Sequence, residues 1–224
     1  MINIAIDGPA GAGKSTIAKR VSKELGYIYV DTGAMYRAMA LYLLREGTPE
    51  DDMEAVSRTC LGADISLRYE NGEQAVLLNG ENVNGLIRTP EVSQMASKCS
   101  VNGDVRARLV ELQQKLGREQ NVVMDGRDIG TVVLPDAQVK IYLTADPRVR
   151  AERRYKEMLA KGEEADLDMI EKEIIERDHR DMTREISPLK KADDAVEVDT
   201  SHMNIEQVTE TILGIIAERR GAQA

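Results

Sequence analysis

The sequence predicts an α/β fold, a five-stranded parallel sheet with helices on both faces. Five short apolar runs at 2–7, 27–30, 122–124, 139–143 and 195–198 are separated by segments with helical periodicity. Such alternation is typical of parallel strands that are buried on both sides. A glycine-rich loop follows the first run, and a larger insert separates the second run from the third. Both observations fit a single domain spanning 1–224.

The glycine-rich loop, residues 8–15, matches the pattern G-x-x-x-x-G-K-S. It consists of Gly8, Pro9, Ala10, Gly11, Ala12, Gly13, Lys14 and Ser15, and Thr16 follows it. Glycines let backbone N–H groups converge on phosphate oxygens, and the following helix directs its positive end at them. Lys14 adds a cation, and the Ser15 hydroxyl can ligate Mg²⁺. Strand, loop and helix together predict a nucleoside triphosphate site. We call residues 8–15 the phosphate loop.

Composition and charge exclude several classes of protein. The net charge of −9 argues against a general nucleic-acid surface, which requires a basic face. The two cysteines, Cys60 and Cys99, are too few for a disulfide framework and form no metal-type cluster. We find no apolar run long enough for a membrane span and no room for a signal peptide. We therefore expect a cytoplasmic monomer that binds small molecules, neither nucleic acid nor membrane.

Residues 34–102 form the insert between the second and third strands. Within it, 63–85 reads as an antiparallel meander, because Asn-Gly pairs at 71–72 and 79–80 flank a β run. Pro90 is expected to open a helix to about 100, and Asn102 to cap the next helix, roughly 104–118. The insert is too long for a simple connection, so we interpret it as a subdomain that binds and covers a substrate.

A second candidate mobile segment, the lid, runs over 147–163 and ends at Gly162. Helical spacing puts Arg150, Arg153 and Arg154 on one side of it. Three guanidinium groups near a phosphate site can clamp a triphosphate and neutralise transition-state charge. The alternative is a solvated basic face paired with nearby glutamates. The chain end, 219–224, is expected to fray.

Acidic side chains follow four of the strands: Asp7, Asp31, Asp125 and Asp199. In parallel sheets, ligands bind beyond these carboxyl ends. Asp125 follows the strand expected beside the phosphate loop, where a carboxylate suits the Mg²⁺ water shell. The alternative is that it only bonds the loop backbone.

A late helix carries Arg177, Asp181 and Arg184 at positions i, i+4 and i+7, on one face. Helix-stabilising ion pairs explain part of this pattern, at about 0.2–0.5 kcal/mol each. The same face can also hold a sugar hydroxyl and a phosphate. His179 faces away from it and is interpreted as exposed.

Taken together, the motifs resemble the bacterial-type cytidylate kinases, a family of nucleoside monophosphate kinases. The matching pieces are IDGPAGAGKST, DTGAMYR, IRTPEV after the meander, DGRDIGTVVLPDA and ERDHRDMTREISPL. They span nearly the whole chain in the family's order. The resemblance implies ATP-dependent phosphorylation of CMP and dCMP, with ATP and Mg²⁺ as cofactors, in pyrimidine nucleotide metabolism.

The resemblance also implies roles for individual residues. Around the acceptor phosphate and ribose it implies Thr32, Arg37, Arg127 and Arg184, with Arg88 nearby; for the sugar, Arg177 and Asp181; and for the cytosine, Ser97, Arg106 and Asp128. A carboxylate at Asp128 would accept from the cytosine amino group and repel the corresponding oxygen of uracil. Charge on the transferred phosphoryl group would be neutralised by Lys14, Arg127, Arg150, Arg153, Arg154 and Arg184.

Two alternatives remain at this stage. The first is a phosphate-loop kinase of another small acceptor, such as UMP or a metabolite like shikimate, which leaves the meander and DGRD unexplained. The second is a nucleotide-dependent switch that binds a partner. Such GTPases read guanine through N/T-K-x-D, and the nearest string, at 190–193, reads Lys-Lys-Ala-Asp.

Overall fold

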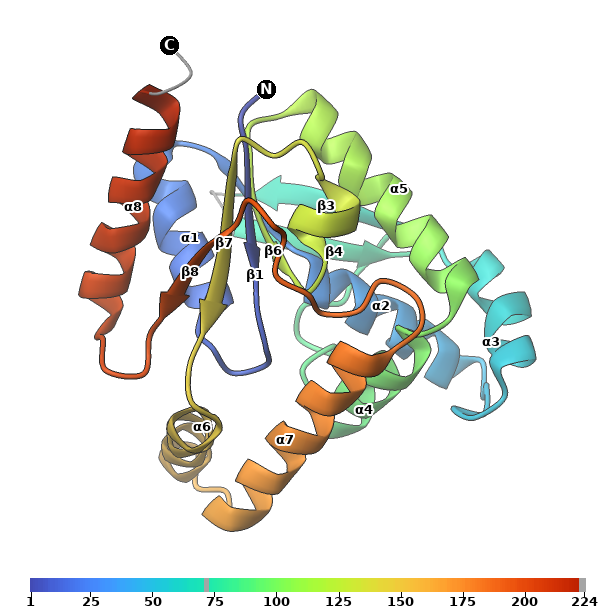
Figure 1. Ribbon diagram of the computed structural model, residues 1–224. Helices are drawn as coiled ribbons and strands as arrows, with labels where there is room; N and C mark the ends of the chain where they lie inside the picture. Colours follow the sequence, from blue (N-terminus) through green and yellow to red (C-terminus); the bar gives the residue numbers. More distant parts are fainter. Residues whose placement is uncertain (71–72, 222–224) are drawn as a thin grey trace.

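A five-stranded parallel sheet forms the centre of the molecule, as the sequence predicts (Figure 1). We describe a computed structural model, over residues 1–70 and 73–221. The strand order is β2-β6-β1-β7-β8. The strands are β1 (Asn3–Asp7), β2 (Ile28–Asp31), β6 (Val122–Gly126), β7 (Val139–Thr144) and β8 (Val196–Asp199). The first strand therefore pairs with two strands far along the chain, and its carboxyl end lies mid-sheet.

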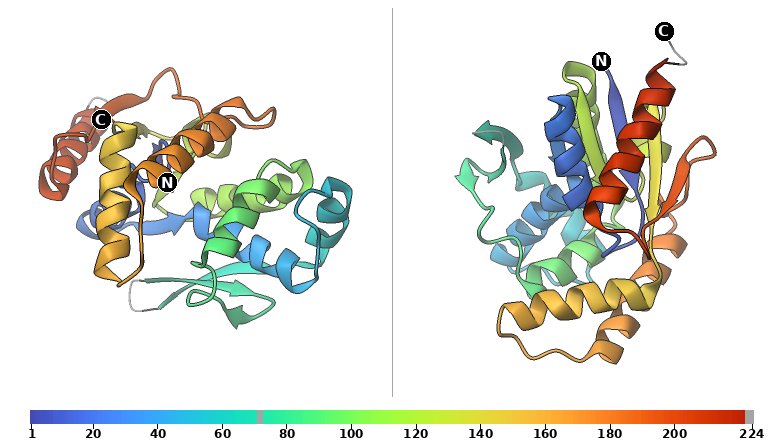
Figure 2. Two further views of the ribbon diagram at one scale, coloured as in Figure 1. Left: turned by 90° about the horizontal axis from the view of Figure 1, so that it is seen from below. Right: turned by 90° about the vertical axis from the view of Figure 1, so that its left-hand side faces the viewer.

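Helices cover both faces of this sheet, and each face has its own apolar core (Figures 1 and 2). Ala5 and Met124 pack with the helices on one face, and Ile4, Ile6 and Val123 pack with those on the other. Alternate strand residues therefore serve opposite cores. The first face is covered by α2 (Thr32–Arg45) and α5 (Gly103–Glu119), and the second by α1 (Lys14–Leu25) and α8 (Ile205–Gly221).

The insert between β2 and β6 contains a small antiparallel sheet of order β3-β4-β5. Its elements are α3 (Met53–Thr59), the 3₁₀ turn η1 (Cys60–Gly62), β3 (Ile65–Glu70), β4 (Glu73–Leu78), β5 (Glu81–Asn82) and α4 (Pro90–Cys99). The Asn79-Gly80 turn is confirmed, with both residues left-handed at φ 49° and 83°. The other predicted turn, at 71–72, lies outside the described residues.

The predicted helix starts in the insert are also confirmed. Thr89 caps α4 by accepting from the Val92 N–H, and Pro90 occupies the first turn. Asn102 caps α5 by accepting from two backbone N–H groups.

Two helices, α6 (Pro147–Ala160) and α7 (Leu167–Thr183), form a hairpin beyond the carboxyl end of the sheet (Figure 1). They share a small core of Ala151, Ile170 and Ile174. Gly162 is left-handed, at φ 77°, directly after α6, so the predicted helix stop is confirmed.

At the carboxyl end of the chain, α8 continues to Gly221, so residues 219–221 of the segment expected to fray are helical. Ile216, buried against the sheet one turn earlier, anchors this end of α8. Residues 222–224 lie outside the described residues. Over 1–70 and 73–221, no helix has the length and apolar character that crossing a membrane requires.

Candidate active site

A cavity of about 340 Å³ lies beyond the carboxyl ends of the central strands, where the fold places ligands. The phosphate loop, the start of α2, α4, the segment after β6 and α7 all contribute to its walls. Its lining includes Lys14, Ser15, Thr32, Arg37, Ser97, Arg106, Asp125, Arg127, Asp128, Arg177, Asp181 and Arg184. Predicted site residues that lie far apart in sequence therefore meet in one cavity.

The phosphate loop adopts a conformation that requires glycine. At Gly8, where φ is 147°, a Cβ atom would lie 1.9 Å from the Leu143 carbonyl oxygen. Gly13 is left-handed immediately before α1. Lys14 is buried, and its Nζ donates to the Pro9 carbonyl at 2.6 Å. Burial, reinforced by the neighbouring Arg127, lowers the pKa of Lys14 well below its ordinary value.

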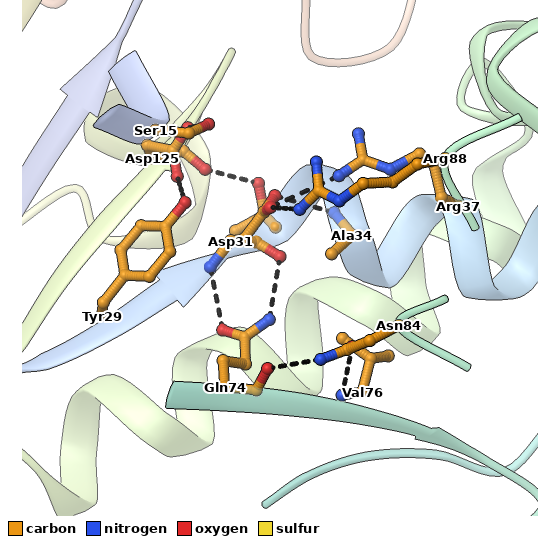
Figure 3. Close-up of polar contacts among 11 residues, drawn as sticks. Ser15, Tyr29, Asp31, Ala34, Arg37, Gln74, Val76, Asn84, Arg88 and Asp125 are labelled. Carbon is orange, nitrogen blue, oxygen red and sulfur yellow. Dashed lines mark hydrogen bonds and ion pairs between the residues drawn. The ribbon is translucent and has the colours of Figure 1, made fainter. Parts of the chain in front are cut away.

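Ser15 and Asp125 place two oxygen atoms side by side at the cavity wall. The Ser15 hydroxyl donates to Asp125 Oδ2 at 2.9 Å, and Tyr29 donates to Asp125 Oδ1 at 2.9 Å (Figure 3). Burial and the nearby Asp31 raise the pKa of Asp125 to about 6. The two hydrogen bonds come from side chains, whereas the alternative from the sequence had Asp125 bond only the loop backbone. Tyr29 was missed in the sequence, because nothing in an apolar strand indicates which tyrosine faces a distant acid.

Asp31 organises a second group at the end of β2. Its Oδ1 accepts from the Ala34 N–H at 2.8 Å and caps α2, while its Oδ2 lies 3.3 Å from guanidinium nitrogens of both Arg37 and Arg88 (Figure 3). Burial lowers the pKa of Arg37. The Arg88 side chain is 64% exposed and lies outside the cavity lining, so it reaches this group from the rim.

Asp128 and Arg106 form a buried ion pair in the cavity wall. Arg184 lies 3.8 Å from the other Asp128 oxygen. The Tyr36 ring lies 5.6 Å from the Arg106 guanidinium, an aromatic partner that sequence analysis also missed. Ser97 on α4 faces the same cavity.

Arg127, Asp181 and Arg177 connect the segment after β6 to α7. Arg127 Nε donates to Asp181 Oδ2 at 2.9 Å. Burial raises the pKa of Asp181, but Arg127 and Arg177 outweigh it, so the pKa falls below its ordinary value. Burial together with Arg127 lowers the pKa of Arg177 to about 10. His179 is exposed, as predicted.

Several donors at this site are buried without a hydrogen-bond partner. They include the Tyr36 hydroxyl and nitrogens of Arg37, Arg106, Arg177 and Arg184. Buried polar groups in folded proteins are nearly always hydrogen-bonded. The walls are therefore suited to a ligand that carries several acceptor oxygens and negative charge.

The three predicted lid arginines do not line the cavity. Arg150 is buried and donates to the carbonyls of Ala145 and Ala10 and to Asp178 at 2.6 Å. Arg153 donates to Thr200, after β8, at 2.6 Å, and Arg154 is exposed. The side of α6 that carries Arg150 and Arg153 thus faces the phosphate loop and the end of β8.

The four strand-end acids also have different surroundings. Asp31 and Asp125 line the cavity. Asp7 is buried and accepts from the Ile129 and Gly130 N–H groups, and Asp199 accepts from Ser201 in its own turn. Over the described ranges 1–70 and 73–221, no group of three or more His, Cys, Asp or Glu side chains is arranged to hold a metal ion.

Comparison with known proteins identifies the family. The family model for cytidylate kinase matches residues 4–218. The chain belongs to the cytidylate kinase family. A cytidylate kinase from Listeria monocytogenes is 52% identical over 215 residues, covering 96% of this chain and 95% of the relative. Another, from Caldicellulosiruptor saccharolyticus, is 50% identical over 212 residues, covering 95% and 94%.

Membership of the cytidylate kinase family makes the chain a nucleoside monophosphate kinase that phosphorylates CMP and dCMP with ATP. Neither alternative from the sequence, a metabolite kinase or a nucleotide-dependent switch, fits this result. A solved gluconokinase from Sinorhizobium meliloti, 14% identical, has a TM-score of 0.50 over 97% of this chain and 92% of its own. That likeness extends to the fold alone.

Proposed function

We propose that CMP or dCMP lies in this cavity with its phosphate toward the phosphate loop and its base toward Asp128 and Arg106. The observation that carries this orientation is the uneven distribution of charge. Arg127 and Arg177 lie near Lys14, and Arg37 lies near Arg177, whereas Asp128 offers a carboxylate beside Arg106. A phosphate dianion and a base with an amino group have complementary requirements.

The acceptor phosphate is assigned to Thr32, Arg37, Arg127 and Arg184, with Arg88 at the rim. Because a phosphate oxygen is already a nucleophile, the transfer needs positioning and charge neutralisation and no general base. Lys14 and Arg127 stabilise charge on the transferred phosphoryl group. If negatively charged phosphate oxygens replaced the Pro9 carbonyl as the partner of Lys14, they would raise its pKa back toward the ordinary value.

The phosphate loop (8–15) with Thr16 is assigned to ATP. Among the lid arginines, we assign Arg154 to the donor phosphates, because its guanidinium is exposed on α6. Arg150 and Arg153 are assigned to holding α6 against the phosphate loop and Thr200.

The sugar and base are assigned to the remaining residues. Arg177 and Asp181 hold the ribose hydroxyls, since Asp181 stays ionised and accepts hydrogen bonds. Ser97, Arg106 and Asp128 read the cytosine. The Asp128 carboxylate attracts the amino group of cytosine and repels the corresponding oxygen of uracil.

Mg²⁺ is assigned to Ser15 and Asp125. Their oxygens are the hard donors that Mg²⁺ prefers, and the exposed Ser15 can be reached by a metal ion. With so few protein ligands, the ion would be held largely by phosphates and water, and it would neutralise developing charge on them.

A steady-state assay tests the metal and acceptor assignments together. ATP is combined with CMP, dCMP, UMP, AMP or GMP, with Mg²⁺ or with EDTA. We expect CMP and dCMP to be the best acceptors and turnover to require Mg²⁺. Ser15→Ala should raise the Mg²⁺ concentration for half-maximal rate by at least the roughly 10- to 100-fold that loss of an outer-shell partner costs.

Ser22→Ala is the matched control. Ser22 lies on the same helix, and its hydroxyl donates to Lys19 away from the cavity. It should leave the Mg²⁺ dependence unchanged. A Ser15→Ala enzyme with the wild-type Mg²⁺ dependence would contradict the metal assignment.

A further inference from the structure

Strand β2 lies at the edge of the main sheet, and among the described residues no strand pairs with the other side of its backbone. The Ile28 N–H donates to Asn121, on the β6 side. Backbone groups alternate along a strand, so those of Tyr29 and Asp31 point toward the open edge. Unpaired edge groups need partners from elsewhere.

The small sheet of the insert supplies these partners through side chains. Gln74 on β4 accepts from the Asp31 N–H at 2.9 Å and donates to the Asp31 carbonyl at 3.5 Å (Figure 3). Tyr69, directly opposite Gln74 on β3, donates to the Tyr29 carbonyl at 3.2 Å. One cross-strand pair thus hydrogen-bonds three backbone groups on the open edge of β2.

Gln74 is itself held in place from the same sheet. Asn84 donates through Nδ2 to the Gln74 carbonyl at 2.8 Å and accepts from the Val76 N–H at 3.0 Å (Figure 3). Gln74 is therefore held at two points. Asn84 bonds its backbone carbonyl, and Asp31 bonds its side-chain amide.

The backbone that Gln74 holds belongs to the residue that organises the arginines. Asp31 caps α2 and is the shared partner of Arg37 and Arg88. With its side chain 8% exposed, Asp31 has little freedom to compensate for a backbone shift. A small displacement at Gln74 is thus passed to both guanidinium groups.

We infer that Gln74 is a positioning residue for the acceptor-phosphate site, acting from the insert through Asp31 on Arg37 and Arg88. The inference rests on the proposed role of these arginines. It gives the small sheet, which does not line the cavity, a part in catalysis.

The test is Gln74→Met, which keeps the side-chain length and removes both hydrogen bonds. The KM for CMP should rise by roughly three- to ten-fold, the worth of about one net hydrogen bond. The kcat should change less than two-fold, and the KM for ATP should stay the same. Binding of cytidine, which lacks the phosphate, should be unaffected, whereas general loosening of the fold would weaken both ligands.

Glu81→Gln is the matched control in the same sheet. Glu81 anchors that sheet to α2 through a two-point ion pair with Arg45, at 2.6 and 3.1 Å, remote from Asp31. It should leave the KM for CMP unchanged. If Gln74→Met does not fold, Asn84→Asp reaches the same position, because it keeps the acceptor for Val76 and loses the donor to Gln74.

Arg37→Met distinguishes a failure of the proposed phosphate site from a failure of the positioning role of Gln74. If it leaves the KM for CMP unchanged, the proposed phosphate site is wrong. If it raises that KM while Gln74→Met and Asn84→Asp do not, the positioning role alone is overturned. In the Arg37→Met background, Gln74→Met should add only the part of its effect that acts through Arg88, so the two effects on the KM for CMP should be less than additive.

Discussion

Asp128 has two roles, because the carboxylate that is assigned to the base also neutralises the buried Arg106. Removing one partner of a buried ion pair typically costs about 3–5 kcal/mol, since a charge is left uncompensated. Asp128→Ala would therefore confuse base selection with stability. Asp128→Asn retains the shape and one acceptor for Arg106, which makes it the cleaner substitution.

We expect Asp128→Asn to reduce the CMP/UMP ratio of kcat/KM by about ten-fold or more, at ~1–3 kcal/mol per base contact. An amide can accept from cytosine or donate to uracil, so it blurs the preference that a carboxylate enforces. The measurement is kcat/KM for both acceptors at saturating ATP, with the thermal midpoint recorded.

Asp136→Asn, an exposed acid outside the cavity lining, controls for the loss of one negative charge. An unchanged ratio in a folded Asp128→Asn enzyme would leave Ser97 and Arg106 as the residues that read the base.

At the scale of elements, Asp7 joins β1 to the π-helical turn η2 (Ile129–Val133) that follows Arg127 and Asp128. Its two oxygens accept from the Ile129 N–H at 2.8 Å and the Gly130 N–H at 2.7 Å. Burial raises the pKa of Asp7 to about 6, although these two hydrogen bonds act in the opposite direction. The central strand and the segment assigned to the substrate therefore meet at a titrating group.

This predicts a pH dependence of stability. Between the unfolded pKa near 4 and the folded value of about 6, folded Asp7 holds a proton that the unfolded chain releases. The Asp7 contribution to stability is thus present below pH 4 and lost as the pH rises to 6. Relative to Asp7→Asn, the unfolding free energy should fall across this window, by at most on the order of 3 kcal/mol.

Urea unfolding of both proteins from pH 3.5 to 7.5, at constant ionic strength, measures this difference. Asp125 titrates in both proteins, so its contribution cancels. A difference that stays flat or rises between pH 4 and 6 would show that Asp7 is ionised throughout.

The elements could be predicted because their signals are local. Apolar runs, the Asn79-Gly80 turn, Pro90 and Asn102 each act within a few residues. Much of the site could also be predicted from the sequence, because motifs at the carboxyl ends of parallel strands meet at the same edge of the sheet.

The rest of the site depends on long-range partners. Helical spacing placed Arg150 and Arg153 together, but it carries no information on whether that side meets the cavity or Thr200. Tyr29 and Gln74 likewise acquire their contacts only when strands distant in sequence lie side by side.

At the scale of the whole molecule, several elements of one chain together line the cavity. Large exposed apolar side chains are scattered over several elements, as Leu61, Leu159 and Ile205 illustrate. Scattered single residues of this kind are normal on monomers. Sedimentation equilibrium at micromolar concentration should therefore give a mass near 24.8 kDa. A dimer mass would contradict this and direct attention to a shared surface.

The hairpin of α6 and α7 also links the two nucleotides. Arg148 on α6 binds Asp168 and Glu171 on α7, and the two helices share a core, so they behave as one body. Arg154 on α6 is assigned to ATP, and Arg177 and Asp181 on α7 are assigned to the ribose. If ATP binding rotates the hairpin, it also moves Arg177 and Asp181 and so changes the affinity for CMP. By thermodynamic reciprocity, CMP then changes the affinity for ATP by the same factor.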